Sequence, residues 1–227
     1  VNGQDINPSG FNIIRVGESI NALYGYQYMG VNMANGNPIY QKANGSLIQG
    51  NITTQSYVGY DPANPSVLGA AATLAAADRK ILGNSLPKWF GGFNNTLTYD
   101  NFDLNVFFRF QGGNYIMNRT RQDLLNMNFV NNSTEVLGRW KSPSEPGDGQ
   151  TPYSSNGFSW LLTDYVVEDA SYVALREILV GYSLPNKLTK RVGIKGLRIY
   201  LTGQNLWFKT AKGYRGLNPE SRFQTGP

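Results

Sequence analysis

Cysteine and histidine are both absent from the 227 residues of the chain. Their absence excludes disulfide bonds, Cys/His zinc sites, cysteine nucleophiles and Ser-His-Asp triads. Charged residues are also scarce, at 15% against roughly 25% in an ordinary soluble domain. Uncharged polar side chains fill the polar positions instead, and aromatic residues reach 13%. This composition is typical both of membrane β-barrels and of secreted β domains that bind carbohydrate, so it leaves both classes open.

The chain lacks a hydrophobic run long enough for a transmembrane helix, which needs about 18 to 20 apolar residues. Its longest apolar run, Val67–Ala77, has eleven residues and is compatible with a short helix inside a loop. The opening residues have neither the basic start nor the apolar core of a signal peptide. We therefore expect either a processed start or an internal piece of a longer protein.

The net charge is +5, but the basic residues are scattered. Their densest cluster, Lys187–Lys195, has the character of a turn beside strands rather than of a nucleic-acid footprint. Nucleic acid is therefore not expected as a partner.

Two alternating runs, residues 89–99 and 102–111, predict a long β-hairpin that turns at Asp100 and Asn101. Successive side chains of a strand point to opposite faces, so each hairpin strand separates its side chains into two sets. In the second run, the apolar set consists of Phe102, Leu104, Val106, Phe108 and Phe110. Each run has about the 9 to 11 residues that a strand needs to cross a bilayer. A transmembrane barrel alternates lipid-facing and lumen-facing residues in this way.

Further strands are expected near residues 20–30, 165–182 and 197–207, and long surface loops near 33–85 and 112–162. Long and short connections therefore alternate, as they do between the outer and periplasmic ends of outer-membrane barrels. The predicted fold class is all-β, as part of a large antiparallel transmembrane β-barrel.

The run 165–182 alternates less clearly than the others. Counting by twos places Val173, Leu175 and Leu179 on one face, and Ile178, Val180 and Tyr182 on the other. The sequence therefore does not assign this strand a clean apolar face.

Several segments, in chain order, resemble the late barrel strands of SusC/RagA-type TonB-dependent outer-membrane transporters. Residues 167–178 (VEDASYVALREI) resemble the family's VEDGSYLRLKNI, and residues 180–185 (VGYSLP) resemble its LGYTLP. Residues 197–206 (LRIYLTGQNL) resemble LRVYVSGQNLF. The other matching segments are Val16–Ile20, Tyr24–Tyr26, Leu82–Asn84, Pro87–Trp89, Gly92–Thr96, Phe102–Leu104 and Arg139–Trp140. Together they cover most of residues 16–218 outside the two long loops.

The resemblance implies a barrel of the 22-stranded plugged class in the bacterial outer membrane. It implies TonB-dependent active import of a nutrient, an oligosaccharide or a peptide, with no bond chemistry and no cofactor. A SusD-like surface lipoprotein, the lipid bilayer and the TonB complex would be the partners, the last through an N-terminal region outside this chain.

Residues 1–227 would form a C-terminal barrel segment in which the plug and the closing strand are absent. The family's closing strand ends in an aromatic residue, whereas this chain stops at Gln224–Pro227. Residues 69–79 also replace the family's Asp/Asn-rich loop, which removes the expectation of a calcium-type site there.

Candidate substrate-binding residues are the aromatic side chains of the second long loop. Exposed rings stack on sugars or anchor peptides, although packing within the loop or contact with the partner lipoprotein would also explain them. The candidates are Trp140, Tyr153, Phe158 and Trp160. No metal-ligating residues are proposed.

The polar residues of the strands are expected to face the lumen: Asp103, Asn105, Arg109 and Arg198. The arginines there would pair with plug acids or with acids of neighbouring strands, such as Asp103 or Glu177. Glu168 and Asp169 are adjacent on a strand and point to opposite faces, so they are poorly placed as a glycosidase pair. We interpret them as a polar cluster at a strand start, and no catalytic residue is predicted.

The alternative class is a soluble secreted β-sandwich that binds glycans. In that fold the apolar face of Phe102–Phe110 would pack against a second sheet.

Overall fold

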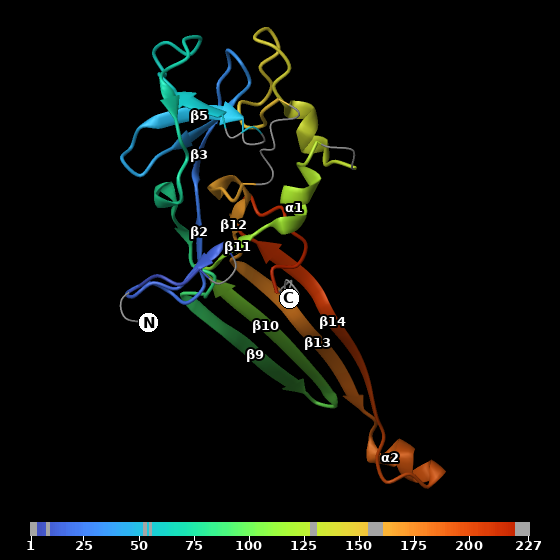
Figure 1. Ribbon diagram of the computed structural model, residues 1–227. Coiled ribbons are helices and arrows are strands. Elements are labelled where there is room, and N and C mark those ends of the chain that lie inside the picture. Colours follow the sequence, from blue (N-terminus) through green and yellow to red (C-terminus); the bar gives the residue numbers. More distant parts are fainter. Residues whose placement is uncertain are drawn as a thin grey trace. The chain divides into compact units, whose positions relative to one another are not determined.

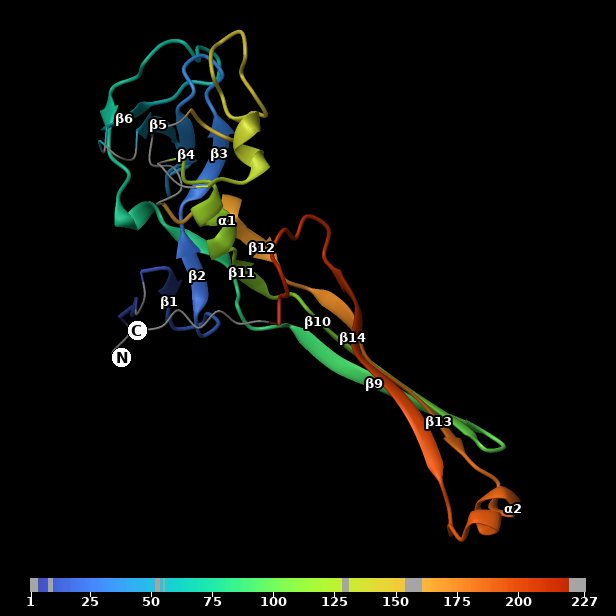
Figure 2. The ribbon, with the colours of Figure 1, turned by 90° about the vertical axis from the view of Figure 1, so that its right-hand side faces the viewer.

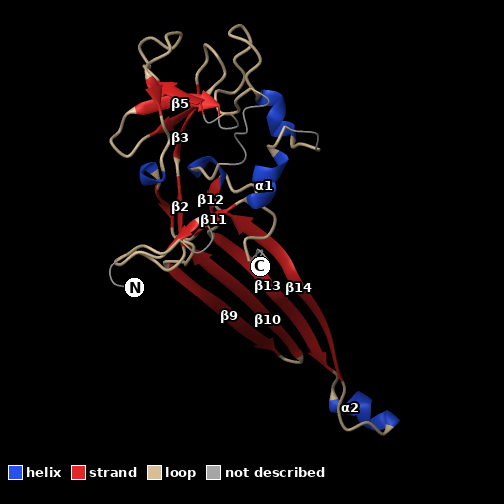
Figure 3. Cartoon of the chain, viewed as in Figure 1, coloured by secondary structure: helices blue, strands red, loops and turns tan. Residues whose placement is uncertain are grey.

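The computed structural model describes residues 4–7, 10–51, 54, 56–127, 131–153 and 161–220. The chain divides into two compact units. The first comprises Val1–Leu86, Tyr115–Glu168 and Arg215–Ser221, and the second Pro87–Asn114, Asp169–Tyr214 and Arg222–Pro227. All strand pairs in the three larger sheets are antiparallel. Strands dominate and the helices are short (Figure 3), as the all-β prediction requires.

The second unit is built on one four-stranded sheet (Figure 1), in the order β14-β13-β10-β9. Its strands are β9 (Trp89–Tyr99), β10 (Phe102–Gly112), β13 (Tyr172–Ser183) and β14 (Arg198–Thr210). The same four strands form a single layer in Figure 2. Asp100 turns the hairpin with a φ of 50°, a conformation that Asp tolerates better than most residues. Between β13 and β14 lie α2 (Asn186–Thr189) and the 3₁₀ turn η5 (Lys190–Val192).

A β-bulge in β13 changes which of its residues share a face, so the faces assigned by counting by twos are wrong. The register of β13 against β10 slips by one residue at Arg176, so Leu175 pairs with Phe108 and Glu177 with Phe107. Val173, Leu175, Ile178, Val180 and Tyr182 therefore share one face. The prediction failed because an extra residue reverses the alternation beyond the bulge.

The first unit contains a five-stranded meander where the sequence predicted a long loop near 33–85. Its strands are β3 (Gln27–Val31), β4 (Pro38–Gln41), β5 (Leu47–Asn51), β6 (Ser56–Gly59) and β7 (Ala71–Ala72), paired in chain order. The first connections are tight turns with Gly36 and Gly45 at positive φ, so the Asn/Gly-rich composition marks hairpin turns. A core cluster lies on this sheet: Tyr26, Tyr28, Val31, Tyr40, Ile48 and Tyr57.

A second sheet of this unit joins β1 (Asn12–Ile13), β2 (Ala22–Gly25) and β8 (Lys80–Gly83). The strand expected near 20–30 is thus divided into β2 and β3. The break lies at Tyr26, which forms a parallel bridge with Thr163. The eleven-residue apolar run forms no regular α-helix. It contains β7 and the first two residues of the 3₁₀ turn η1 (Ala76–Asp78).

The predicted loop near 112–162 also contains short elements. These are β11 (Tyr115–Met117), α1 (Arg119–Leu124) and the 3₁₀ turn η2 (Thr134–Gly138). A further 3₁₀ turn, η4 (Asp164–Val166), precedes β12 (Val167–Asp169), which pairs with β11. Among the residues that the structure describes, no helix is long and apolar enough to cross a membrane.

Candidate functional site

The four-stranded sheet has one mainly apolar face, which the strand register assembles from all four strands. Asn95, paired with Val106, and Lys209, paired with Val173, are the polar residues that the register places on it. Leu104 pairs with Leu97 of β9 and Val180 of β13, and Val180 in turn pairs with Leu201 of β14. This face remains exposed: Phe93 is 55%, Leu97 59% and Leu201 78% accessible. An apolar surface of this extent indicates a partner or a lipid environment. Its further members are Val106, Phe108, Phe110, Val173, Leu175, Ile178, Ile199 and Trp207.

Aromatic side chains lie at both ends of this face. Tyr99, Phe102 and Tyr182 form one row beside the hairpin turn, and the rings of Phe102 and Tyr182 are 4.5 Å apart. Towards the other end, the rings of Trp89 and Phe110 are 6.1 Å apart. An 11-residue strand extends about 36 Å, or about 28 Å along the membrane normal at a 40° tilt. These strands are therefore long enough for the apolar band and aromatic girdles of an outer-membrane barrel.

The opposite face carries the sheet's charged and amide side chains together with some apolar ones, namely Phe107, Leu179, Tyr200 and Phe208. An ion pair crosses this face, which we call the polar face. Asp103 of β10 and Arg198 of β14 are separated by β13, yet Arg198 Nε lies 3.1 Å from Asp103 Oδ1. The two side chains meet over β13 at the position of Gly181. A Cβ at that position would lie 2.5 Å from both Arg198 Nη2 and Asp103 Oδ1. The missing side chain thus makes room for the contact.

The other predicted lumen residues lie on this same polar face. Asn105 Nδ2 donates to Asn94 Oδ1 at 3.0 Å and to Thr96 Oγ1 at 2.9 Å. Arg109 pairs in register with Gly92, which has no side chain, and with Ala174, and its own side chain is exposed. The structure therefore brings Asp103 and Arg198 together and places all four residues on one face.

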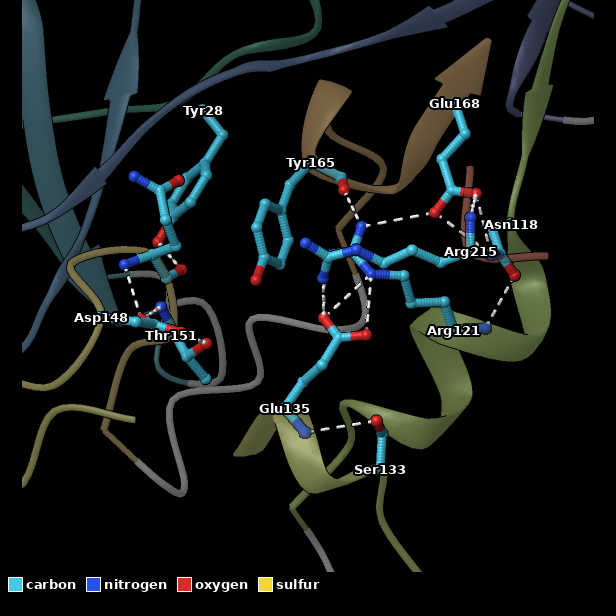
Figure 4. Close-up of polar contacts among 11 residues, drawn as sticks. Tyr28, Asn118, Arg121, Ser133, Glu135, Asp148, Thr151, Tyr165, Glu168 and Arg215 are labelled. Carbon is cyan, nitrogen blue, oxygen red and sulfur yellow. Dashed lines mark hydrogen bonds and ion pairs between the residues drawn. The ribbon is translucent and has the colours of Figure 1, made fainter. Parts of the chain in front are cut away.

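In the first unit, a charged cluster gathers around the buried Arg121 of α1 (Figure 4), which is 7% exposed. Its Nη2 lies 3.1 Å from Glu135 Oε2, and its Nη1 lies 3.6 Å from Glu168 Oε1. The same guanidinium lies over the ring of Tyr165, at 4.3 Å from the centroid, and donates to the Tyr165 carbonyl. A buried arginine needs such compensation, because an unpaired charge there would be costly.

Two further residues complete this Arg121 cluster. Asn118 caps α1 by accepting from the Arg121 backbone N–H at 2.9 Å, and its amide donates to both oxygens of Glu168. Arg215 donates its backbone N–H to Glu168 Oε2 at 2.9 Å and its guanidinium to Glu135. The Arg121 cluster thus joins α1, η2, β12 and the segment at Arg215, which are far apart in the sequence.

The segment 138–153 is ordered by Asp148 (Figure 4). Its carboxylate accepts from the backbone N–H groups of Gln150 and Thr151, at 2.8 and 2.7 Å, and from the Thr151 hydroxyl. The segment lies along β3, where Tyr28 Oη donates to the Gln150 carbonyl at 2.7 Å. The Pro/Ser/Gly-rich residues here therefore form a specific, hydrogen-bonded loop.

Of the predicted substrate-binding aromatics, Trp140 and Tyr153 lie within the described residues and Phe158 and Trp160 lie outside them. The Trp140 indole N–H donates to the Met33 carbonyl at 2.9 Å, and its ring packs on Gly36, where a Cβ would lie 2.4 Å from Cε3. The Tyr153 ring meets Trp140 edge-on at 6.5 Å. The indole therefore has a packing role at the β3–β4 turn, and Tyr153 remains partly exposed.

Glu168 and Asp169, weighed above as a glycosidase pair, and the nearby Asp164 all bind groups of the protein itself. Glu168 belongs to the Arg121 cluster, and Asp169 accepts from the Ser171 backbone N–H at 2.9 Å. Asp164 accepts from the Tyr28 backbone N–H at 2.8 Å. Burial raises the pKa of Asp164 above its usual 3.8, although that hydrogen bond and nearby Lys80 oppose the shift. Their contacts are those of structural residues.

Sequence reasoning missed Arg121, Glu135, Asp148 and Gly181. The single signal for the Arg121 cluster was Glu168, because a carboxylate at the start of a buried strand requires a cation or several donors. Which arginine supplies that charge depends on irregular backbone between α1 and β12, which no periodicity encodes. Gly181 lies in a matched motif, but its role depends on the register of three strands.

A long antiparallel sheet with an exposed apolar face and a polar face has the construction of a transmembrane β-barrel wall. No family model matches the chain. Sequence comparison identifies the TonB-dependent receptor P3 of Formosa agariphila, 33% identical over 214 residues, as a relative. The match covers 93% of this chain and 20% of P3. The TonB-dependent receptor SusC of Bacteroides thetaiotaomicron is 29% identical over 65% of this chain and 14% of SusC.

Among solved structures, a chain of the RagAB peptide importer in the closed-closed state matches with a TM-score of 0.72 and 22% identity. The match covers 95% of this chain and 22% of that one. The chain is therefore homologous to a segment of the SusC/RagA-type TonB-dependent receptors, which confirms the resemblance found in the sequence. It spans roughly a fifth of the length of its first relatives. TonB-dependent receptors reside in the bacterial outer membrane.

Proposed function

We propose that the protein to which this chain belongs imports a nutrient, an oligosaccharide or a peptide, across the outer membrane with energy from the TonB complex. The chain supplies part of the barrel wall and part of the surface segments, and performs no bond chemistry. The observation that carries the proposal is the exposed apolar face of β9, β10, β13 and β14.

Lipid is the environment that suits this face. Burying side chains such as Leu97 and Leu201 contributes about 25 cal/mol per Å² of apolar surface removed from water. Among the strands that the structure describes, β9 and β14 are the outer strands of the sheet, and each has one edge without a partner. Open edges are not tolerated in lipid, so further strands of the longer protein would pair with both.

The polar face would line the lumen, with Asp103, Asn105, Arg109 and Arg198 in contact with the plug or with water. The ion pair of Asp103 and Arg198 supports this assignment, because a lipid-facing ion pair would lose its hydration without compensation. On this proposal, the pair stiffens the wall near its short-turn end.

The first unit would supply surface segments that contact a SusD-like lipoprotein and the substrate. Tyr153 is the better placed of the two described aromatics, because the Trp140 indole is committed to Met33 and Gly36. Phe158 and Trp160 remain part of this proposal from their place in the sequence. TonB would act through an N-terminal region outside the chain.

The soluble β-sandwich is the competing class. It requires a second sheet over the Phe102–Phe110 face. Among the described residues no second sheet covers this face, and the Phe102 side chain is 54% exposed. The exposed face therefore favours the barrel wall.

A fractionation experiment tests the proposal on the full-length protein. We expect its intact mass to be several times 25.1 kDa and its extraction from membranes to require detergent. Uptake of the nutrient by cells should stop when TonB is deleted. A protein of about this chain's mass that stays monodisperse without detergent would overturn the barrel assignment in favour of the sandwich.

A further inference from the structure

The connection between β13 and β14 concentrates positive charge. Residues 184–197 contain Lys187, Lys190, Arg191 and Lys195, four of the 20 basic residues of the chain and none of its 15 acidic residues. All four side chains are exposed. We call residues 184–197 the basic turn. The transport function proposed above makes no use of it.

The basic turn is compact and held by its own backbone. Leu188 N–H donates to the Pro185 carbonyl at 2.9 Å, and Ile194 N–H donates to the Thr189 carbonyl at 3.1 Å. Gly193 allows the reversal with a φ of 72°. The cations are therefore presented on a defined scaffold rather than on a flexible tail.

Apolar side chains are exposed in the same turn. Leu188 is 52% and Ile194 43% accessible, although both lie among the cations. Leu197 follows, and by strand alternation it shares a face with Ile199 and Leu201 of the apolar wall. The apolar face thus reaches the edge of the basic turn at Leu197, and the turn itself carries the exposed side chains of Leu188 and Ile194.

The turn lies at the end of the sheet that carries the aromatic row of Tyr99, Phe102 and Tyr182. Aromatic residues occupy the level of the lipid headgroups in membrane proteins. If the sheet crosses the membrane, the basic turn emerges at that level.

We propose that the basic turn binds anionic phospholipid headgroups of the periplasmic leaflet. The proposal rests on the proposed function, which makes this short connection periplasmic. Leu188 and Ile194 reach the acyl boundary, while the lysine and arginine stems extend along the apolar surface and place their charges at the phosphates. An acidic protein would match the charge but would leave the exposed Leu188 and Ile194 without an apolar partner.

The test uses the full-length transporter purified in detergent and offered equal amounts of phosphatidylglycerol and phosphatidylcholine. Native mass spectrometry counts the lipids that remain bound. The variant K187Q/K190Q/R191Q/K195Q removes the cations of the turn. The matched control K80Q/R119Q/K141Q/K212Q removes four exposed cations elsewhere. A third variant replaces the three lysines of the turn by arginine, which keeps the charge.

The wild type, the control and the arginine variant should retain phosphatidylglycerol selectively. The glutamine variant should retain about tenfold less phosphatidylglycerol than the wild type, or less still. Added salt should weaken retention by the wild type. Equal retention by the glutamine variant, or equal loss in the control, would overturn the proposal.

Two readouts separate the possible failures. Loss of retention by the glutamine variant supports the proposal where its circular dichroism spectrum matches that of the wild type. If the spectra differ, the arginine variant carries the test: it keeps the charge, so loss of lipid retention by this variant would refute the proposal. A transporter that needs detergent but shows no lipid preference would refute the lipid site alone. A protein that fractionates without detergent would refute the transport proposal itself.

Discussion

At the scale of single residues, Asp103 and Arg198 meet across an intervening strand because Gly181 has no Cβ. The substitution Gly181→Ala should separate the pair, since the new carbon would lie 2.5 Å from both partners. The cost of Asp103→Asn should therefore shrink towards zero in the Gly181→Ala background. Thermal unfolding of the full-length protein in a double-mutant cycle measures this coupling.

Gly203→Ala is the control for that cycle, because its Cβ would meet Leu206 on the apolar face rather than the ion pair. Its effect should add to that of Asp103→Asn. Additive effects for Gly181→Ala as well would show that the pair is not linked through that position.

Asp164 offers a second prediction at this scale, through its raised pKa. Because the folded chain holds the proton more tightly than the unfolded one, wild-type stability falls as pH rises from 3.8 through the raised pKa, and levels off above it. Asp164→Asn keeps the acceptor for the Tyr28 N–H and removes the buried charge. The variant should be at least as stable as the wild type at neutral pH, and its advantage should shrink in acid.

Melting temperatures of both proteins from about pH 4 to about pH 8 provide the measurement. A variant that is less stable at neutral pH would mean that the charge itself, through Lys80, is favourable.

The partners of single residues were only partly predictable from the sequence. Asp103 was named as a possible partner for the strand arginines because alternation places it on their face. Arg121 was not singled out, since its acids lie 14 and 47 positions away along irregular backbone. Regular strands transmit side-chain direction over many residues, whereas loops do not.

At the scale of elements, α1 depends on the Arg121 cluster for its place in the first unit. Removing one partner of a buried ion pair typically costs about 3 to 5 kcal/mol, so Arg121→Ala should open α1 and η2 locally. Arg119→Ala on the same helix removes an arginine that is 49% exposed and pairs with Asp123, and should cost less than about 1 kcal/mol. Hydrogen exchange of α1 and η2 in the full-length protein distinguishes the two variants.

Equal protection of α1 in both variants would contradict this role. Arg121 would then be stabilised by Tyr165 packing alone, and its ion pairs would contribute little.

The elements themselves were predictable to different degrees. The long hairpin of β9 and β10 follows from uninterrupted alternation over 11 residues in each strand. The meander β3–β7 was missed because its strands have two to five residues, too few to establish a period. In β13 the bulge at Arg176 reverses the alternation, so a correct strand prediction gave wrong faces.

At the scale of the whole molecule, the wall requires that its two faces meet different surroundings. Val106 lies midway along β10 on the apolar face, and Asn105 lies next to it on the polar face. An arginine on the lipid side of a barrel wall near the bilayer midplane costs about 2 to 4 kcal/mol. If the apolar face meets lipid as proposed, Val106→Arg should reduce the amount of assembled protein. Asn105→Arg introduces the same side chain at nearly the same depth, but on the polar face, which we propose lines the lumen.

The assembled protein recovered from outer membranes should therefore fall for Val106→Arg and stay within about twofold of wild type for Asn105→Arg. The comparison isolates direction, because charge, size and depth are shared by the two variants. A soluble sandwich would also bury Val106, but it would leave no membrane-assembled protein to measure for either variant. Equal loss in both would mean that neither face of β10 meets lipid, and the wall would have to be assigned to an interior surface of the longer protein.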